Sequence, residues 1–359
     1  MTLKSTLILL TTCLTTAVAT ADETPAAALL VLNKGDNSLA IVDPTSLKVV
    51  GCAPAGADPH EVIASADGKL AFISNYGAGH TLSVVDLVAQ KSLPAVELGA
   101  LRPPHGLAIA DGKIYFTAEG SKVIGRYDPS SHLIDWVLGL GQNRTHMIVV
   151  SKDAKHVFTS NVESDTISLI EKSSGPGGPG SGFGGPPPGG PGNGNPPPGG
   201  PGGPPGGRGQ ADWTETHIAV GHGPEGFDLS PDGKEIWAAN SHDGTVSIID
   251  VAKKTVVATL NVPGFANRLK FTLDGKLVLI SDLGSSDLLV VDVGSRTEVK
   301  RIKLGGGSAG ILMQPDGSRA YVAVGSDHGV VVIDLKTLEV AGHIETGRGP
   351  DGLGWAIRN

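Results

Sequence analysis

The chain repeats one pattern of short hydrophobic runs along most of its length. An acidic residue ends the third run of each copy, and five of the six intervals between these residues are 42 or 43 residues long. The sixth interval contains one further repeat and a Gly/Pro-rich insert. The acidic residues are Asp43, Asp86, Asp128, Glu171, Asp250, Asp292 and Asp334. A period of this length, built from alternating apolar runs, predicts a β-propeller with one blade per repeat.

Each copy predicts four antiparallel strands. In the copy that begins at Gly223, the runs GFDLS, EIWAAN, TVSIID and TVVATL follow one another, and a PDGK turn separates the first two. Gly233 in that turn occupies the position that favours a positive φ. The acidic residue after the third run is expected to accept backbone N–H bonds in an Asx-turn, which is a structural role.

The two ends of the chain complement each other. The first repeat, ALLVLNKG onwards, lacks an inner strand, and the last residues, GPDGLGWAIRN, form an inner strand with no blade after it. Joining them closes the ring and leaves no exposed sheet edge at the two ends. We therefore predict an all-β fold: a seven-bladed β-propeller of four-stranded antiparallel blades, closed by a C-terminal strand.

Two segments differ from the repeats. Residues 1–21 have a basic residue, a short apolar core and an Ala-Thr-Ala end, which predicts a signal peptide cleaved near Ala21 and a periplasmic or extracellular protein. Residues 173–210 are almost entirely Gly and Pro and interrupt the fourth blade. This composition predicts a disordered insert, which is either a tolerated insertion or an attachment to the cell envelope or a protein partner. The domain assignment is thus a single propeller over residues 22–359.

Charge and cysteine content exclude several classes of protein. The formal net charge is −8, which argues against a nucleic-acid-binding surface. The apolar run near the N-terminus is too short for a transmembrane anchor. Only Cys52 remains after signal cleavage, so no internal disulfide can form, and we expect this thiol to be buried. We expect a monomer.

The repeats resemble the YVTN-repeat β-propellers of exported bacterial and archaeal surface proteins. The resemblance rests on the PDGK turns, on FISN, FTSN and WAAN where the family has YVTN, and on the SVVD and SIID runs that follow. It covers the chain from Ala28 to Asn359 except the insert. The motif implies the fold but not the chemistry, because propellers have many functions.

Polar side chains occur at one equivalent position of the predicted inner strands. This position lies seven residues before the Asp of the turn between the first and second strands, or six in the third blade. In ring order the residues are Asp351, His60, His105, His146, Glu225, Asn267 and Ala309. Because inner strands surround a narrow channel, we expect these side chains to converge at its mouth.

This ring predicts either of two kinds of site. Imidazole and carboxylate groups are suitable ligands for Zn²⁺, Cu²⁺ or Fe²⁺, and the candidate ligands are His60, His105, His146 and Glu225. Alternatively, the ring holds a small polar ligand, in which Arg268 pairs with a carboxylate or phosphate and a histidine acts as a base. The ligand-binding candidates on the inner strands and on the loops after the second strands are Glu61, Asn267, Arg268, Asp351, Asn75, Tyr76 and Glu119.

Two other functions remain open. PHE at His60 and PPHG at His105 are similar to motifs of propeller lactonases, which implies a hydrolase in which a histidine activates water. A non-catalytic scaffold at the cell surface would use the outer faces and the insert. The sequence alone does not choose between binding, hydrolysis and scaffolding.

Overall fold

The computed structural model describes residues 23–77, 79–172, 213–262 and 264–358. The predicted signal peptide and the Gly/Pro-rich insert lie outside the described residues. Within them, strands dominate, and one 3₁₀ turn, η1 (Lys34–Asp36), follows the first strand. The described part contains no helix long and apolar enough to cross a membrane.

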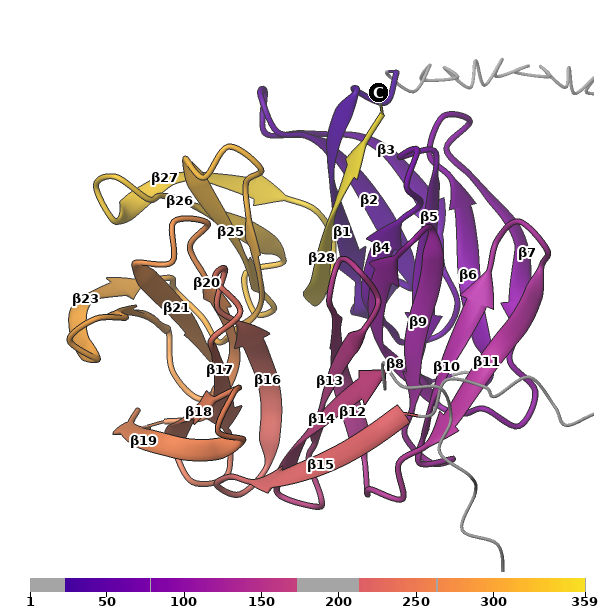
Figure 1. The fold of residues 1–359 in the computed structure, drawn as a ribbon. Coiled ribbons are helices and arrows are strands. Elements are labelled where there is room, and N and C mark those ends of the chain that lie inside the picture. Colours follow the sequence, from indigo (N-terminus) through magenta and orange to yellow (C-terminus); the bar gives the residue numbers. More distant parts are fainter. Residues whose placement is uncertain (1–22, 78, 173–212, 263, 359) are drawn as a thin grey trace, which may run out of the picture.

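The strands form seven four-stranded antiparallel sheets around a common centre (Figure 1). Blade 1 consists of β28 (Pro350–Ile357), β1 (Ala27–Asn33), β2 (Ser38–Asp43) and β3 (Lys48–Pro54). Blade 2 consists of β4 (Pro59–Ala64), β5 (Leu70–Asn75), β6 (Thr81–Asp86) and β7 (Lys91–Glu97). Blade 3 consists of β8 (Pro104–Ala110), β9 (Lys113–Ala118), β10 (Val123–Asp128) and β11 (Leu133–Gly139).

Blades 4 to 7 continue around the ring in the same order. Blade 4 consists of β12 (Thr145–Val150), β13 (His156–Asn161), β14 (Thr166–Lys172) and β15 (Trp213–Ala219). Blade 5 consists of β16 (Pro224–Leu229), β17 (Glu235–Asn240), β18 (Thr245–Asp250) and β19 (Thr255–Asn261). Blade 6 consists of β20 (Ala266–Phe271), β21 (Leu277–Asp282), β22 (Asp287–Asp292) and β23 (Thr297–Lys303). Blade 7 consists of β24 (Ser308–Met313), β25 (Arg319–Val324), β26 (Gly329–Asp334) and β27 (Glu339–Glu345).

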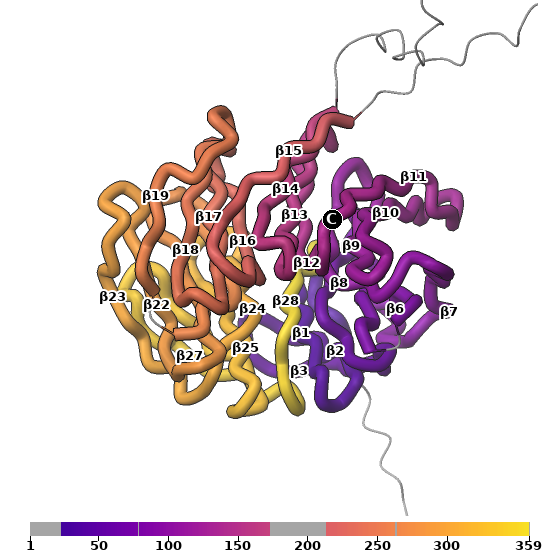
Figure 2. The backbone as a smooth tube through the Cα atoms, turned by 90° about the horizontal axis from the view of Figure 1, so that it is seen from below, coloured from indigo at the N-terminus to yellow at the C-terminus, as the bar shows by residue number. Residues whose placement is uncertain are grey.

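The C-terminal strand closes the ring, as predicted. β28 pairs antiparallel with β1, and the register places Ala27 opposite Ile357 and Leu30 opposite Gly354. Figure 2 shows β28, at the end of the chain, beside the first strands. Because β1 has β2 on its other side, this pairing leaves neither edge of β1 exposed.

The hydrophobic core is divided among the blade interfaces. The described residues form seven buried clusters, each shared between two neighbouring blades. The second strands are buried along almost their whole length: five of the six residues of β5 and of β17 are buried. The fourth strands lie outside and are mostly exposed, as in β7. Every blade is therefore held by the hydrophobic effect on both of its faces.

Local turn chemistry follows the sequence prediction at most positions. Asp43, Asp86 and Asp334 accept backbone N–H bonds from residues two positions later, so these acids are Asx-turn residues. Gly233 has a φ of 74°, as expected. The prediction for Cys52 was wrong: the thiol is exposed, because alternation along the outer strand β3 turns Ala53 inward and Cys52 outward.

Candidate ligand site at the mouth of the channel

A β-bulge in every inner strand builds the site. In blade 2 the pairing of β4 with β5 shifts between Pro59 and Val62. Two residues of β4, His60 and Glu61, therefore lie opposite one residue of β5. The inner strands of the other blades shift at the equivalent place. A bulge redirects side chains that would otherwise alternate between faces. Consequently two consecutive residues of one strand, such as His60 and Glu61, both line the channel.

The second of the two bulge residues, the one that follows the ring residue, is a glycine in four blades. A Cβ at Gly106, Gly226, Gly310 or Gly352 would clash with the backbone carbonyl of the ring residue in the next blade. Glycine is required here because neighbouring inner strands approach closely. The other three blades place Glu61, Met147 and Arg268 at this position.

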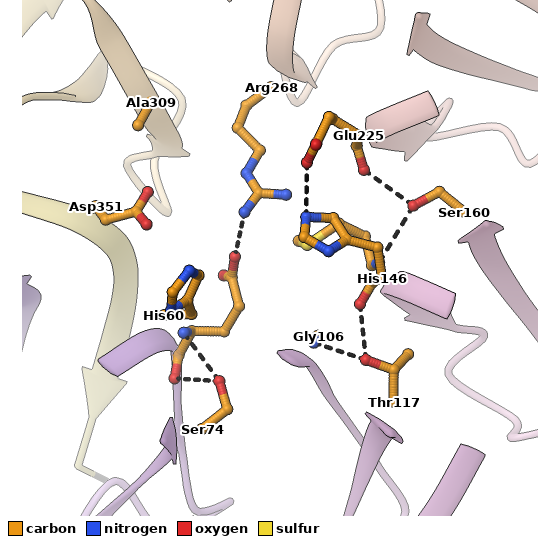
Figure 3. Close-up of polar contacts among 12 residues, drawn as sticks. His60, Ser74, Gly106, Thr117, His146, Ser160, Glu225, Arg268, Ala309 and Asp351 are labelled. Carbon is orange, nitrogen blue, oxygen red and sulfur yellow. Dashed lines mark hydrogen bonds and ion pairs between the residues drawn. The ribbon is translucent and has the colours of Figure 1, made fainter. Parts of the chain in front are cut away.

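Hydroxyl groups on the second strands join the bulges of neighbouring blades. Thr117 Oγ1 accepts a bond from the Gly106 amide (2.8 Å) and donates to the carbonyl of His146 (2.7 Å). Ser160 bonds in the same way to Met147 and Glu225. Figure 3 shows these links behind the ring. They fix the height at which the ring side chains enter the channel.

All seven predicted ring residues line one cavity of about 470 Å³, which we call the upper cavity. Lys34 and Arg144 also line it, and both were missed by the sequence prediction. Part of the wall is small or apolar, with Phe265, Leu283 and Ala309. The structure therefore brings together His60, His105, His146, Glu225, Asn267, Ala309, Arg268 and Asp351.

His146 is held between two carboxylates. Its Nδ1 lies 2.5 Å from Glu119 Oε1 and its Nε2 lies 2.8 Å from Glu225 Oε2. Burial lowers the pKa of His146, but the bonds to Glu119 and Glu225 outweigh burial and raise the pKa above its ordinary value. Since carboxylates only accept, both ring nitrogens donate, and His146 is an imidazolium.

His105 stacks on His146 with ring centroids 3.6 Å apart. It is 1% exposed, and no described group bonds to its Nδ1. Burial, followed by the charge of His146, lowers the pKa of His105 well below its ordinary value. His105 is thus a neutral imidazole with an unused ring nitrogen.

His60 is also neutral, and its partners define its tautomer. Its Nδ1 donates to the carbonyl of Asp58 (2.9 Å), and its Nε2 accepts from Lys34 Nζ (2.9 Å). Burial, followed by the charge of Lys34, lowers the pKa of His60. Lys34 also lies 3.2 Å from Asp351.

Arg268 and Glu61 form an ion pair across the channel. Arg268 Nη2 donates to Glu61 Oε1 at 2.8 Å, although these residues come from blades 6 and 2. Figure 3 shows Arg268 pointing into the middle of the ring. Glu61 lines the next part of the channel rather than the upper cavity.

Three candidates lie outside the lining of the upper cavity: Asn75 is the last residue of β5, and Tyr76 and Glu119 directly follow β5 and β9. Glu119 is directly behind His146, and the Tyr76 hydroxyl donates to Glu119 Oε2 (2.9 Å). Burial and Glu119 together raise the pKa of Tyr76 to about 12, so this phenol stays protonated. Asn75 instead donates its amide to Thr81 and Ser83 of the next strand.

The residues that sequence reasoning missed had recognisable signals. Lys34 follows the second strand of its blade at the same place as Tyr76 and Glu119 in theirs. Arg144 precedes its ring residue by two positions, as Asp58 does, and both have a positive φ. Aligning these loop positions across the blades would have added both cations to the site.

A metal ion has one candidate site among the described residues. One potential ligand atom from each of His105, Glu119 and His146 lies within 4.8 Å of the other two, so this buried group could hold a metal. The trio differs from the predicted set, because His60 bonds to Lys34 and Glu225 lies on the other side of the His146 ring.

Comparisons with known proteins show the fold. No model of a protein family and no curated protein matches the sequence. A functionally unknown protein from Desulfotomaculum acetoxidans has a TM-score of 0.70 at 11% identity, over 92% of this chain and 99% of that one. Hydrazine synthase from Kuenenia stuttgartiensis has a TM-score of 0.63 at 19% identity, over 84% and 90%.

A third similar structure is the dihydro-heme d1 dehydrogenase NirN in complex with DHE. It has a TM-score of 0.61 at 15% identity, and the match covers 89% of this chain and 63% of that one. At these identities the likeness establishes a β-propeller and carries no function across. Membership of the YVTN-repeat family stays a prediction.

Proposed function

We propose that this protein is an exported β-propeller of the YVTN-repeat type that binds a small organic anion in the upper cavity. The observation that carries the proposal is the charge of the lining, where Lys34, Arg144 and Arg268 outnumber the carboxylates of Glu225 and Asp351. The imidazolium of His146 is balanced by Glu119 behind it, so the excess rests on the three cations of the lining. A carboxylate or phosphate ester is the chemistry that such a lining favours.

Arg144 has donor capacity to spare. Its guanidinium lies 3.8 Å from Glu119 and 3.5 Å from Glu225, which is longer than a direct hydrogen bond. One third of its side chain is exposed. Arg144 can therefore turn toward a bound anion without breaking a short ion pair.

The cavity has room for a carbon skeleton as well as a charged group. Its volume of about 470 Å³ falls in the range of about 300–1,000 Å³ that is usual for small-molecule sites. Phe265, Leu283 and Ala309 in the same lining offer apolar contact beside the charged residues. The signal-like residues 1–21, outside the described part of the chain, support export.

Calorimetric titration tests the proposal with inorganic phosphate, succinate and citrate as probes. We expect at least one probe to bind with a Kd below about 1 mM, and Arg144→Gln or Lys34→Gln to weaken it by about tenfold or more. Lys303→Gln is the matched control, because Lys303 is an exposed cation on the outer strand β23, where it pairs with Asp287. The absence of binding by all three probes, or an equal loss in Lys303→Gln, would contradict the proposal.

A transition metal is the second candidate ligand, and the spacing of His105, Glu119 and His146 favours it. Binding would require His146 to lose the proton that it donates to Glu119 and the three atoms to move closer together, since Zn–N distances are about 2.0–2.1 Å. Metal analysis of untagged protein by mass spectrometry tests this candidate. Stoichiometric metal that is lost in the His105→Ala/His146→Ala variant would establish it, and metal-free wild-type protein would exclude it.

A further inference from the structure

The channel continues beyond the ring into a second cavity, which we call the lower chamber. It has a volume of about 330 Å³, and its walls are formed by the bulges and by the inner-strand residues after them. Arg268 is the residue that lines both cavities, and its ion pair with Glu61 separates them.

The walls of the lower chamber are mostly apolar. Several of its hydrophobic side chains are only partly buried within the described structure, so they present apolar surface to the channel. They include Ile63, Leu107, Met147, Leu312, Leu353 and Trp355. Covering such surface with an apolar group is favourable, and concave apolar sites with few polar groups are typical ligand sites.

One polar group at the end of the chamber lacks a partner. Arg268 is 8% exposed, and its Nη1 has no hydrogen-bond partner among the described residues, whereas its Nη2 donates to Glu61. A buried donor without an acceptor is unfavourable, and a guanidinium requires an oxygen acceptor. Because Nη1 itself is covered, a ligand oxygen would satisfy it once the guanidinium turns toward the chamber.

The donor of Arg268 that lacks a partner favours an anionic oxygen. Besides Arg268 and Glu61, the charged residue at the wall is Lys270, whose ammonium pairs with Asp228 at 3.0 Å. Glu61 already occupies one side of the guanidinium. Lys270 is therefore balanced by Asp228, and the donor left for a second carboxylate is Nη1 of Arg268.

We propose that the lower chamber is a second binding site, for a medium-chain carboxylic acid whose carboxylate bonds to Arg268 Nη1 and whose alkyl chain lies against Met147, Leu312 and Trp355. This site is distinct from the upper cavity and does not depend on what the upper cavity binds. The ligand class follows from an apolar channel that ends at an unsatisfied guanidinium.

Calorimetry with octanoate as the probe tests the ligand class. We expect Kd to fall about fourfold for each added CH₂ between butanoate and octanoate, because each methylene leaves water. Octanoate is expected to bind at least tenfold more tightly than 1-octanol, since the alcohol lacks the anionic group for Arg268. Equal affinities along the series, or for acid and alcohol, would overturn the proposal.

The position of the probe is tested by tryptophan fluorescence with 8-bromooctanoate. Of the four tryptophans, Trp355 lines the chamber, Trp237 is fully buried between blades 5 and 6, and Trp136 and Trp213 pack on each other on outer strands. We expect the bromine to quench Trp355, and the quenching to disappear in Trp355→Phe. Quenching that persists in Trp355→Phe would place the acid elsewhere and overturn the proposal.

Variants separate this site from the upper cavity. Leu312→Trp fills the chamber and is expected to weaken octanoate binding at least tenfold, whereas Leu312→Met keeps the volume and apolar character of the wall and is expected to keep binding within a few-fold. Arg144→Gln, which affects the upper cavity, should leave octanoate binding unchanged. An octanoate affinity that follows Arg144 instead of Leu312 would overturn the proposal, and the phosphate, succinate and citrate titrations report on the upper cavity independently.

Discussion

Arg268 of blade 6 donates a hydrogen bond to Glu61 of blade 2 at 2.8 Å, and this single ion pair separates the two cavities of the channel. Both residues occupy the second position of a β-bulge, where four other blades have glycine. The pair therefore exists because the bulge turns an additional side chain toward the channel in these blades.

Removing one partner of this pair should destabilise the protein strongly. The side chains are 10% and 17% exposed, so Glu61→Met leaves Arg268 as a buried charge without its carboxylate. We expect a loss of about 3 kcal/mol in the free energy of unfolding for Glu61→Met or Arg268→Met. The double variant should lose less than the sum of the two single variants, as measured by urea denaturation. Strictly additive losses would show that the two residues do not interact.

His146 and His105 should differ in protonation at neutral pH although their rings stack. His146 donates to Glu119 and Glu225, whereas burial and the charge of His146 lower the pKa of His105. We expect ¹⁵N NMR at pH 7 to show an imidazolium for His146 and a neutral ring for His105. Glu225→Gln should lower the pKa of His146, because it removes one of the two carboxylates. Two neutral rings in the wild-type protein would contradict this assignment.

The same contacts make stability depend on pH in a defined direction. Because folding raises the pKa of His146, its contribution to the free energy of unfolding is fully present when the pH is below the pKa of the unfolded state, about 6.5. This contribution is lost as the pH rises through the pKa of the folded state. The stability difference between the wild-type protein and His146→Gln should therefore shrink as the pH rises above about 6.5. Urea denaturation between pH 6 and 9 measures it, and a difference that grows with pH would have the wrong sign.

Glu225 should make the stability of the protein depend on pH under acidic conditions. Burial raises the pKa of Glu225, but the bond to His146 and its charge outweigh burial and lower the pKa to about 2. The contribution of Glu225 to the free energy of unfolding is present when the pH is above the pKa of the unfolded state, about 4.3. It is lost as the pH falls toward about 2. We expect Glu225→Gln to flatten the loss of stability between these values. An unchanged acid profile would show that Glu225 is not paired in solution.

The sequence predicted the fold more completely than the site. Each repeat carries its own turn residues and apolar alternation, so the blade boundaries and the closing strand could be derived from local patterns. The ring could be placed because equivalent residues of inner strands converge. The bulge was not recognised, because the shift in alternation that it causes falls mostly on polar residues and glycines at the start of each inner strand, where there is little hydrophobic pattern to show it. For this reason Glu61 was expected beside His60 at the mouth, whereas it lies in the lower chamber.

Close contact between inner strands should make the bulge glycines intolerant of substitution. A Cβ at Gly310 would clash with the carbonyl of Asp351, whereas a Cβ at Gly139 on an outer strand meets no atom of the described structure within 4 Å. We expect Gly310→Ala to destabilise the protein by about 1–3 kcal/mol or more, and Gly139→Ala to change stability by less than about 0.5 kcal/mol. Thermal unfolding of the two variants side by side measures this. Equal stabilities would mean that the inner strands can separate at little cost.

Ring closure should decide whether the propeller folds as one unit. Deletion of residues 350–359 would leave the inner edge of β1 unpaired and would remove the side chains of Asp351 and Trp355 from the channel. An exposed edge invites intermolecular pairing, and the lost contacts are comparable with a net stability of about 5–15 kcal/mol. We therefore expect the truncated protein to aggregate or to unfold without a sharp transition. A synthetic peptide covering residues 349–359 should restore cooperative unfolding by pairing with β1, whereas a scrambled peptide should not. A truncated protein that stays monomeric and unfolds sharply without the peptide would show that six complete blades hold the ring without its closing strand.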